Sequence, residues 1–153
     1  MADIVSPKVR SRMMAGIRSK NTKPELIIRK GLHRKGFRFR LHDKGLLGKP
    51  DLVLPRYQAV VFVNGCFWHG HDCHLFRVPA TRTDFWKQKI SKNKENDKIA
   101  TASLSDDGWR IATVWECALK GKGKIKEDDV IEMLSSWLKS EECTISVRGN
   151  NLS

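Results

Sequence analysis

The chain has 153 residues, a length that suits one domain and is short for two. Hydrophobic residues make up 40% of the sequence, which is enough to build a core and argues against a mostly disordered chain. No apolar run approaches the roughly 18 residues of a membrane span, and residues 1–20 lack the long apolar stretch of a secretory signal. The composition therefore predicts a cytoplasmic protein, in which cysteines are more often metal ligands or free thiols than disulfides.

Positive charge is concentrated in the first third of the chain. The formal net charge is +12, with 29 Lys and Arg against 17 Asp and Glu. Residues 1–50 contribute +11, residues 51–100 contribute +3, and residues 101–153 contribute −2. Lys and Arg that displace counterions from phosphates gain affinity without reading sequence, so this distribution favours a nucleic-acid partner over an anionic membrane surface. A surface that merely keeps the protein in solution is the alternative.

The first predicted element is a basic arm or short helix over residues 1–20, which has few apolar side chains to bury. Thr22 is the expected N-cap of the next helix. Pro24 suits its first turn, and Glu25 stands three residues after the cap, as in a capping box. The expected buried face of this helix consists of Leu26, Ile27, Ile28 and Leu32, and Gly36 ends it.

Short apolar or alternating runs predict the strands, and two longer periodic segments predict further helices. The expected strands cover residues 37–41, 51–54, 59–63 and 109–115, and the expected helices cover 83–104 and 130–138. Residues 64–82 have no helical period and form a loop. The order α-β-β-β-α-β-α predicts an α/β fold, with a mixed central β-sheet flanked by helices. We expect one domain over residues 21–140 and a C-terminal tail over 141–153.

The loop at 64–82 contains a cluster of metal-binding residue types. The stretch Cys66-Phe-Trp-His-Gly-His-Asp-Cys-His74 offers two cysteines and three histidines within nine positions. Zinc prefers four thiolate or imidazole ligands in a tetrahedron, and a distant cysteine that closed the site would pin the loop to the sheet. The candidate ligands are Cys66, His71 and Cys73 in the loop, with Cys117, after the predicted strand at 109–115, as the distant cysteine. Buried free cysteines beside exposed histidines are the alternative, and a redox dithiol is disfavoured because no CxxC pair exists.

A second candidate site is the Pro50-Asp51 step at the start of a predicted strand. A carboxylate in this position of a basic protein can hold a hard divalent cation beside a phosphate. Taken alone, the dipeptide is more typical of an ordinary turn. Nucleases of the PD-(D/E)xK type carry a second acidic residue and a lysine on the next strand, which here reads Val60-Val-Phe-Val-Asn64 and has neither. The residues alone leave the role of Asp51 open.

Aromatic side chains form a third candidate site. Phe67 and Trp68 lie in an irregular loop that can hardly bury both rings, which favours stacking on or between bases. Trp86 opens the basic helix at 83–104, where packing against the sheet and contact with DNA explain it equally well.

Several sequence blocks together resemble the very short patch repair endonucleases. These blocks are Gly-Cys-Phe-Trp-His at 65–69, His71-x-Cys73, Val-Pro-Ala-Thr-Arg-Thr at 78–83, Phe85-Trp86, and Val-Trp-Glu-Cys-Ala-Leu at 114–119. The similarity runs from about Arg10 to Trp137. It implies a PD-(D/E)xK-related, restriction-endonuclease-like fold with a structural zinc, and an enzyme that nicks DNA immediately 5′ of the thymine in a T·G mismatch.

The resemblance also implies a role for individual residues. Asp51 and the main-chain oxygen of Val63 would hold Mg²⁺, His69 would act as the general base, and Glu25 would belong to the active-site network. The implied zinc ligands are Cys66, His71, Cys73 and Cys117, with His74 a bystander; the implied DNA wedges are Phe67, Trp68 and Trp86, with Met14 and Ile17 entering from the minor groove. Glu25 therefore has two interpretations, helix cap and active-site carboxylate. Asn64, Gly70 and Asp72 stand where relatives have histidines.

The expected activity is Mg²⁺-dependent phosphodiester hydrolysis that leaves a 3′-hydroxyl and a 5′-phosphate. Its partner would be double-stranded DNA with a T·G mismatch from deamination of 5-methylcytosine, gripped by basic residues such as Arg10 and Arg12. Mismatch-repair proteins and a polymerase are further candidate partners, and we expect a monomer at the bacterial nucleoid, without a membrane partner. Two alternatives stay open: a restriction endonuclease of the same fold that cuts both strands, and a zinc-stabilised DNA-binding module without catalysis.

Overall fold

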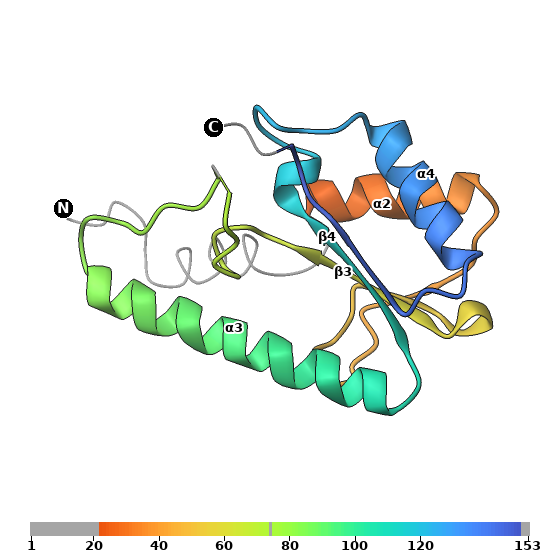
Figure 1. The fold of residues 1–153 in the computed structure, drawn as a ribbon, viewed down its shortest axis with the longest axis horizontal. Coiled ribbons are helices and arrows are strands. Elements are labelled where there is room, and N and C mark those ends of the chain that lie inside the picture. Colours follow the sequence, from red (N-terminus) through yellow and green to blue (C-terminus); the bar gives the residue numbers. More distant parts are fainter. Residues whose placement is uncertain (1–21, 74, 151–153) are drawn as a thin grey trace, which may run out of the picture.

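A computed structural model describes residues 22–73 and 75–150 of the chain, in which helices and strands form an α/β fold (Figure 1). The strands are β1 (Arg40–Leu41), β2 (Leu52–Leu54), β3 (Ala59–Asn64), β4 (Arg110–Trp115) and β5 (Thr144–Val147), and the helices are α2 (Lys23–Arg34), α3 (Thr83–Asp106) and α4 (Glu127–Leu138). Two short 3-10 turns, Pro55–Tyr57 and Glu116–Ala118, follow β2 and β4. The basic arm with Arg10, Arg12, Met14 and Ile17, and also His74, lies outside the described residues.

The five strands form one mixed sheet in the order β1-β2-β3-β4-β5. Strands β1, β2 and β3 run antiparallel, with Val53 opposite Val60. The β3–β4 pair is parallel, and so is the β4–β5 pair. A parallel pair needs a long crossover, which α3 supplies between β3 and β4. The mixed sheet flanked by helices is the fold class that the sequence predicted.

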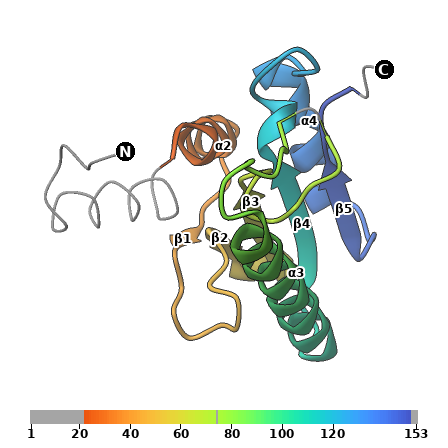
Figure 2. The ribbon, with the colours of Figure 1, turned by 90° about the vertical axis from the view of Figure 1, so that its left-hand side faces the viewer.

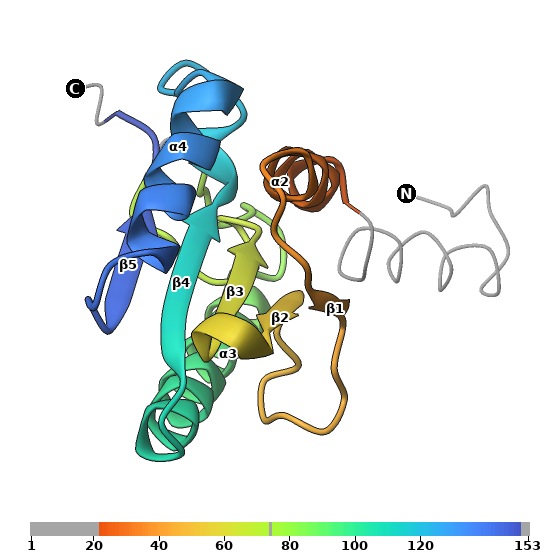
Figure 3. The same ribbon diagram turned by 90° about the vertical axis from the view of Figure 1, so that its right-hand side faces the viewer.

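Helices cover both faces of this sheet. Helices α2 and α4 pack on one face, and α3 packs on the other (Figures 2 and 3). Successive strand residues point to opposite faces, so Leu52 and Leu54 contact the α2–α4 side while Val53 contacts the α3 side. This two-sided burial explains why β2 and β3 are continuous apolar runs rather than alternating ones.

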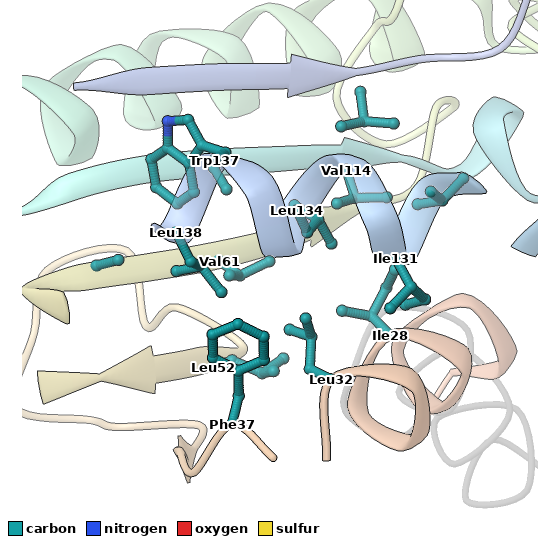
Figure 4. Packing of buried hydrophobic residues seen from close by; sticks show 14 of the residues in the cluster. Ile28, Leu32, Phe37, Leu52, Val61, Val114, Ile131, Leu134, Trp137 and Leu138 are labelled. Atoms are coloured by element: carbon teal, nitrogen blue, oxygen red, sulfur yellow. The ribbon is translucent and has the colours of Figure 1, made fainter. Parts of the chain in front are cut away.

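The larger core cluster lies between the sheet, α2 and α4. Ile28 and Leu32 of α2 face Leu134 and Leu138 of α4 across the apolar side chains of β2, β3 and β4 (Figure 4). Thr22 caps α2 as predicted, since its side chain accepts the Glu25 N–H at 3.4 Å. Within the described part of the chain, no helix is long and apolar enough to cross a bilayer.

The predicted strand at 37–41 is shorter than expected. Only residues 40–41 pair, because the Phe37 ring turns into the core, where it packs at 5.4 Å from the Tyr57 ring. The alternation of apolar and basic residues over 37–41 therefore reflects two things: burial of Phe37 in the core and a strand of only two residues.

A fifth strand lies in the segment that the sequence analysis treated as a tail. β5 pairs parallel with β4 at the sheet edge, and Val147 is its one buried residue. Arg110 of β4 holds the chain that leads to it, donating to the carbonyls of Trp137 at 2.6 Å and Ser140 at 2.8 Å. Four residues with a single buried side chain give too weak a pattern for prediction, and β5 depends on these non-local contacts.

Candidate active site and metal cluster

An open cleft of about 1020 Å³ lies where β2 and β3 meet the start of α2 and the middle of α3. It brings together the residues proposed for catalysis and metal binding with two of those proposed for DNA contact: Glu25, Asp51, Val63, His69, Phe67 and Trp68 all line it. Asn64 lines it as well. The cleft therefore joins carboxylates, an imidazole and aromatic rings on one surface.

Asp51 stands immediately before β2, and its carboxylate faces the next strand. Its Oδ2 accepts the Val63 N–H at 2.6 Å. Burial raises the pKa of Asp51 to about 7; the Val63 N–H opposes this rise, and the nearby Glu25 carboxylate adds to it. Two carboxylates in one partly buried site repel each other, and a divalent cation between them would relieve that repulsion.

Glu25 reaches the same site from the first turn of α2. Its side chain is 2% exposed, although glutamate is rarely so deeply buried. The carboxylate lies 2.7 Å from Nε2 of His42 and 3.3 Å from the Arg29 guanidinium. Thr22 is the N-cap of α2, as predicted. The Glu25 carboxylate, which the sequence leaves open as a helix cap or an active-site group, lines the cleft. Glu25, His42 and Asp51 each place a ligand atom within 4.8 Å of the other two.

His69 forms a pair with a carboxylate on α3. Its Nδ1 lies 2.5 Å from Oδ2 of Asp97. An ionised carboxylate only accepts, so Nδ1 carries the hydrogen and Nε2 is left free to take a proton. His69 is also near enough to Asp51 to lower the pKa of that carboxyl. An imidazole held in this tautomer is able to act as a general base.

The loop that carries His69 lies tightly on α3. Asn93 of α3 donates to the Trp68 carbonyl at 2.9 Å. Gly70 has φ +60°, and a Cβ at this position would meet Ile90 at 2.7 Å and Lys94 at 2.9 Å. Glycine therefore suits both the positive φ and the close approach to α3 at this position.

The second cluster contains the four residues predicted to bind zinc. Cys66, His71, Cys73 and Cys117 place their ligand atoms within 4.8 Å of one another. Nδ1 of His71 is 3.5 Å from Sγ of Cys66 and 3.6 Å from Sγ of Cys117. The His71 ring stacks on Trp115, with 3.9 Å between centroids, so its orientation is fixed. The four side chains form a Cys3His cluster able to hold a metal ion.

Backbone N–H groups and burial define the chemistry of this cluster. Cys117 N–H donates to Sγ of Cys66, and Gly149 N–H donates to Sγ of Cys117, each at 3.3 Å. Burial raises the pKa of both thiols, so a cation is needed to hold them as thiolates. Burial lowers the pKa of His71, which keeps its ring in the neutral, ligating form.

The aromatic residues also come together. The Phe67 ring lies 5.0 Å from Trp68 and 5.4 Å from Trp86, and the two tryptophan rings are 5.7 Å apart. Phe85 adds a ring 5.1 Å from Trp86 and is 43% exposed. Phe67 and Trp68 line the cleft, and the Trp86 ring contacts both of them from outside its lining. We call Phe67, Trp68, Phe85 and Trp86 the aromatic wall.

Sequence reasoning missed three contributors to these sites. Asp97 lies 28 residues from His69 on a polar helix rich in acidic and basic residues, so nothing in its spacing indicated the pair. His42 was unnoticed beside a predicted turn. Gly149 supports Cys117 from the segment taken as a tail, and a Cβ there would lie 2.2 Å from the Cys117 carbonyl oxygen.

Comparison with known proteins finds relatives that resemble this chain over nearly its whole length. A family model described as DNA mismatch endonuclease Vsr matches residues 2–75. The chain is 42% identical over 147 residues to the DNA mismatch endonuclease Vsr of Escherichia coli, covering 96% of this chain and 94% of the relative. It is 47% identical over 126 residues to the type II nicking enzyme V.XorIIP of Xanthomonas oryzae, covering 82% and 93%.

These similarities define a nuclease that acts on DNA as a hydrolase. The chain belongs to the Vsr family of DNA mismatch endonucleases. The family resemblance seen in its sequence blocks is thereby confirmed.

Proposed function

We propose that this protein nicks one strand of duplex DNA immediately 5′ of the thymine in a T·G mismatch and so starts very short patch repair. The observation that carries the proposal is the cleft, in which the Glu25 and Asp51 carboxylates, the His69–Asp97 pair and the aromatic wall adjoin one another. The Asp51 strand and its antiparallel neighbour β3 support assignment to the PD-(D/E)xK-like nucleases.

Asp51 and the main-chain oxygen of Val63 are the proposed ligands of a catalytic Mg²⁺. The N–H and C=O of one strand residue project from the same strand edge, and the Val63 N–H faces the Asp51 carboxylate. Oxygen donors are the ligands that Mg²⁺ prefers. When bound, the ion would stabilise negative charge on the scissile phosphate and on the leaving 3′ oxygen.

His69 is the proposed general base that takes a proton from the attacking water. Asp97 would hold its ring in the orientation that leaves Nε2 free. Asp97→Asn is therefore expected to lower kcat about 10- to 100-fold, less than loss of the base itself, with the affinity for mismatched DNA unchanged. Single-turnover nicking and binding measurements check this, with Glu95→Gln on the exposed face of the same helix as the control. A wild-type kcat in Asp97→Asn would exclude the role.

The Cys3His cluster is proposed to hold a structural zinc ion. Zinc bonds of about 2.3 Å to sulfur and about 2.0–2.1 Å to nitrogen, at tetrahedral angles, place the two ligand atoms about 3.5 Å apart. The 3.5 Å and 3.6 Å separations between His71 and the two buried cysteines support that geometry. All four positions are filled by protein ligands, as in structural rather than catalytic sites.

The aromatic wall is proposed to read the lesion. A mispaired step costs less to unstack than a matched one, so rings at the cleft enter there preferentially. Trp68→Ala is expected to reduce the preference for T·G over T·A duplexes by roughly 1–3 kcal/mol. Trp86→Ala should reduce it less, because Trp86 contacts Phe67 and Trp68 but does not line the cleft. Trp109→Ala is the control, since Trp109 packs in the smaller core cluster and should lower the Tm alone. Unchanged preference in both wall variants would mean that these rings only pack the protein.

One assay tests the proposal against its alternatives. Purified protein with Mg²⁺ is given matched and T·G duplexes, each strand labelled in turn. We expect one nick, on the thymine strand, ending in a 3′-hydroxyl. Cleavage of both strands of a matched duplex would favour a restriction endonuclease, an alternative that the nicking relatives fit only in part. Binding without cleavage would favour a DNA-binding module. A monomeric state and contacts with repair proteins belong to the same proposal.

A further inference from the structure

We propose that His42 is a positioning residue that holds the Glu25 carboxylate beside Asp51 and thereby completes a two-carboxylate cation site. The inference rests on the proposed function, because it concerns the cation site of that reaction.

The side chain of His42 makes a direct contact with Glu25. Nε2 lies 2.7 Å from Oε2 of Glu25, and the two side chains are only 15% and 2% exposed. A carboxylate so deeply buried needs a hydrogen bond donor, and the imidazole N–H supplies one. A carboxylate can accept at several lone-pair positions, so the bond to His42 is compatible with the Glu25–Asp51 contact. His42 also lines the cleft.

The backbone of His42 is tied to the main chain of Asp51. Its N–H donates to the main-chain oxygen of Asp51 at 3.1 Å, one residue beyond the Leu41–Leu52 pair of β1 and β2. One residue therefore connects Asp51 through its main chain with Glu25 through its side chain. Any shift of the β1–β2 register would move the imidazole away from Glu25.

The backbone conformation of His42 is unusual for a residue other than glycine. Its φ is +50°, in the left-handed region, where asparagine and aspartate are enriched along with histidine. Backbone strain of this kind persists only where surrounding contacts impose it, and it gathers at functional sites. Here it coincides with a residue that contacts the Glu25 carboxylate through its side chain and the Asp51 carbonyl through its backbone.

Electrostatics explain why a donor is needed at this point. Ligand atoms of Asp51 and Glu25 lie within 4.8 Å of each other, and the Glu25 carboxylate disfavours ionisation of Asp51. Arg29 approaches Glu25 from one turn along α2 at 3.3 Å and would draw the carboxylate toward the outer side of the helix. The His42 N–H acts against that displacement and keeps the carboxylate at the cleft.

Two variants that differ by one methylene separate positioning from other roles. Asparagine tolerates a positive φ, but its amide is too short to reach Glu25. The glutamine amide nitrogen reaches about as far as Nε2 and donates the same hydrogen bond, yet it lacks an imidazole to ligate a metal. His33→Gln, an exposed change in the last turn of α2, is the matched control.

The experiment measures Mn²⁺ binding to the zinc-loaded protein by calorimetry, together with the Mg²⁺ concentration for half-maximal nicking. We expect His42→Asn to weaken Mn²⁺ affinity and to raise the Mg²⁺ requirement, each about 10- to 100-fold, with the Tm and the metal-free affinity for DNA near wild type. His42→Gln should restore most of both losses, and His33→Gln should change neither.

Two outcomes would overturn the inference. Wild-type Mn²⁺ affinity in His42→Asn would mean that the contact does not hold the site together. An equal loss in His42→Asn and His42→Gln would mean that the ring nitrogen is itself a metal ligand. If the wild-type protein binds Mn²⁺ but does not nick T·G duplexes, the proposed function fails while the binding series still decides the role of His42.

Discussion

Asp51→Asn is expected to abolish strand nicking, with a loss of at least about 10³-fold in kcat, while mismatched DNA still binds. The substituted side chain has the same size as the native aspartate, and its oxygen can still accept the Val63 N–H. The change removes the negative charge that would hold a divalent cation. Single-turnover nicking and fluorescence anisotropy measure the two effects separately. Asp106→Asn, at the exposed end of α3, is the matched control and should nick normally.

A stability measurement distinguishes a catalytic loss from a folding defect. The pKa of Asp51 is raised from an ordinary 3.8 to about 7, chiefly by burial. Between these pH values the unfolded chain gives up this proton before the native protein does, so stability falls as pH rises and stays lower above about pH 7. Asn carries no such penalty. Asp51→Asn should therefore melt no lower than wild type at pH 8 without added Mg²⁺.

Addition of Mg²⁺ should reverse the order of the two proteins. A ligand that binds only the native state raises the Tm, so wild type should gain stability at pH 8 and Asp51→Asn should not. Nicking by Asp51→Asn at a rate near wild type would remove Asp51 from the catalytic site. An Mg²⁺-induced rise in the Tm of both proteins would place the ion elsewhere.

Local sequence signals predicted the elements that define this fold. The Thr22 cap depends on an interaction between near neighbours in the sequence. Strands β2, β3 and β4 are buried over most of their length, and such burial leaves a continuous apolar run in the sequence. The Cys3His cluster was predictable because three of its ligands lie within one short loop. Its fourth ligand, Cys117, was indicated only by its position after a buried strand.

The parts that escaped prediction depend on contacts between distant segments. β5 is a short edge strand tied to Arg110, and Asp97 meets His69 only because α3 crosses back over the sheet. Arg110 and Asp97 read locally as ordinary surface charges. The same holds for His42, whose partner Glu25 is 17 residues away. A functional polar pair of this kind has no periodicity, since its geometry comes from the fold alone.

Cys117→Ser is expected to cost the protein its metal and its fold together. Cys117 is 1% exposed and joins β4, the 64–82 loop and the C-terminal segment through Cys66, His71 and Gly149. Structural zinc contributes about 10–16 kcal/mol to the folding of small zinc peptides, while a whole domain is stable by only about 5–15 kcal/mol. Loss of one ligand is therefore enough to unfold the loop and loosen the sheet edge. We expect less than stoichiometric zinc and a Tm far below wild type.

Cys143→Ser provides the matched control, because Cys143 is exposed and lies outside the cluster. It should keep one zinc per chain and an unchanged Tm. If Cys117→Ser is insoluble, the wild-type protein answers the same question: a thiol-reactive mercurial should release one zinc per chain, and the Tm should fall in step with release because ligand binding energy is also folding energy here. Active wild-type protein without zinc, or zinc release that leaves the Tm unchanged, would show that the four side chains pack the loop without a metal.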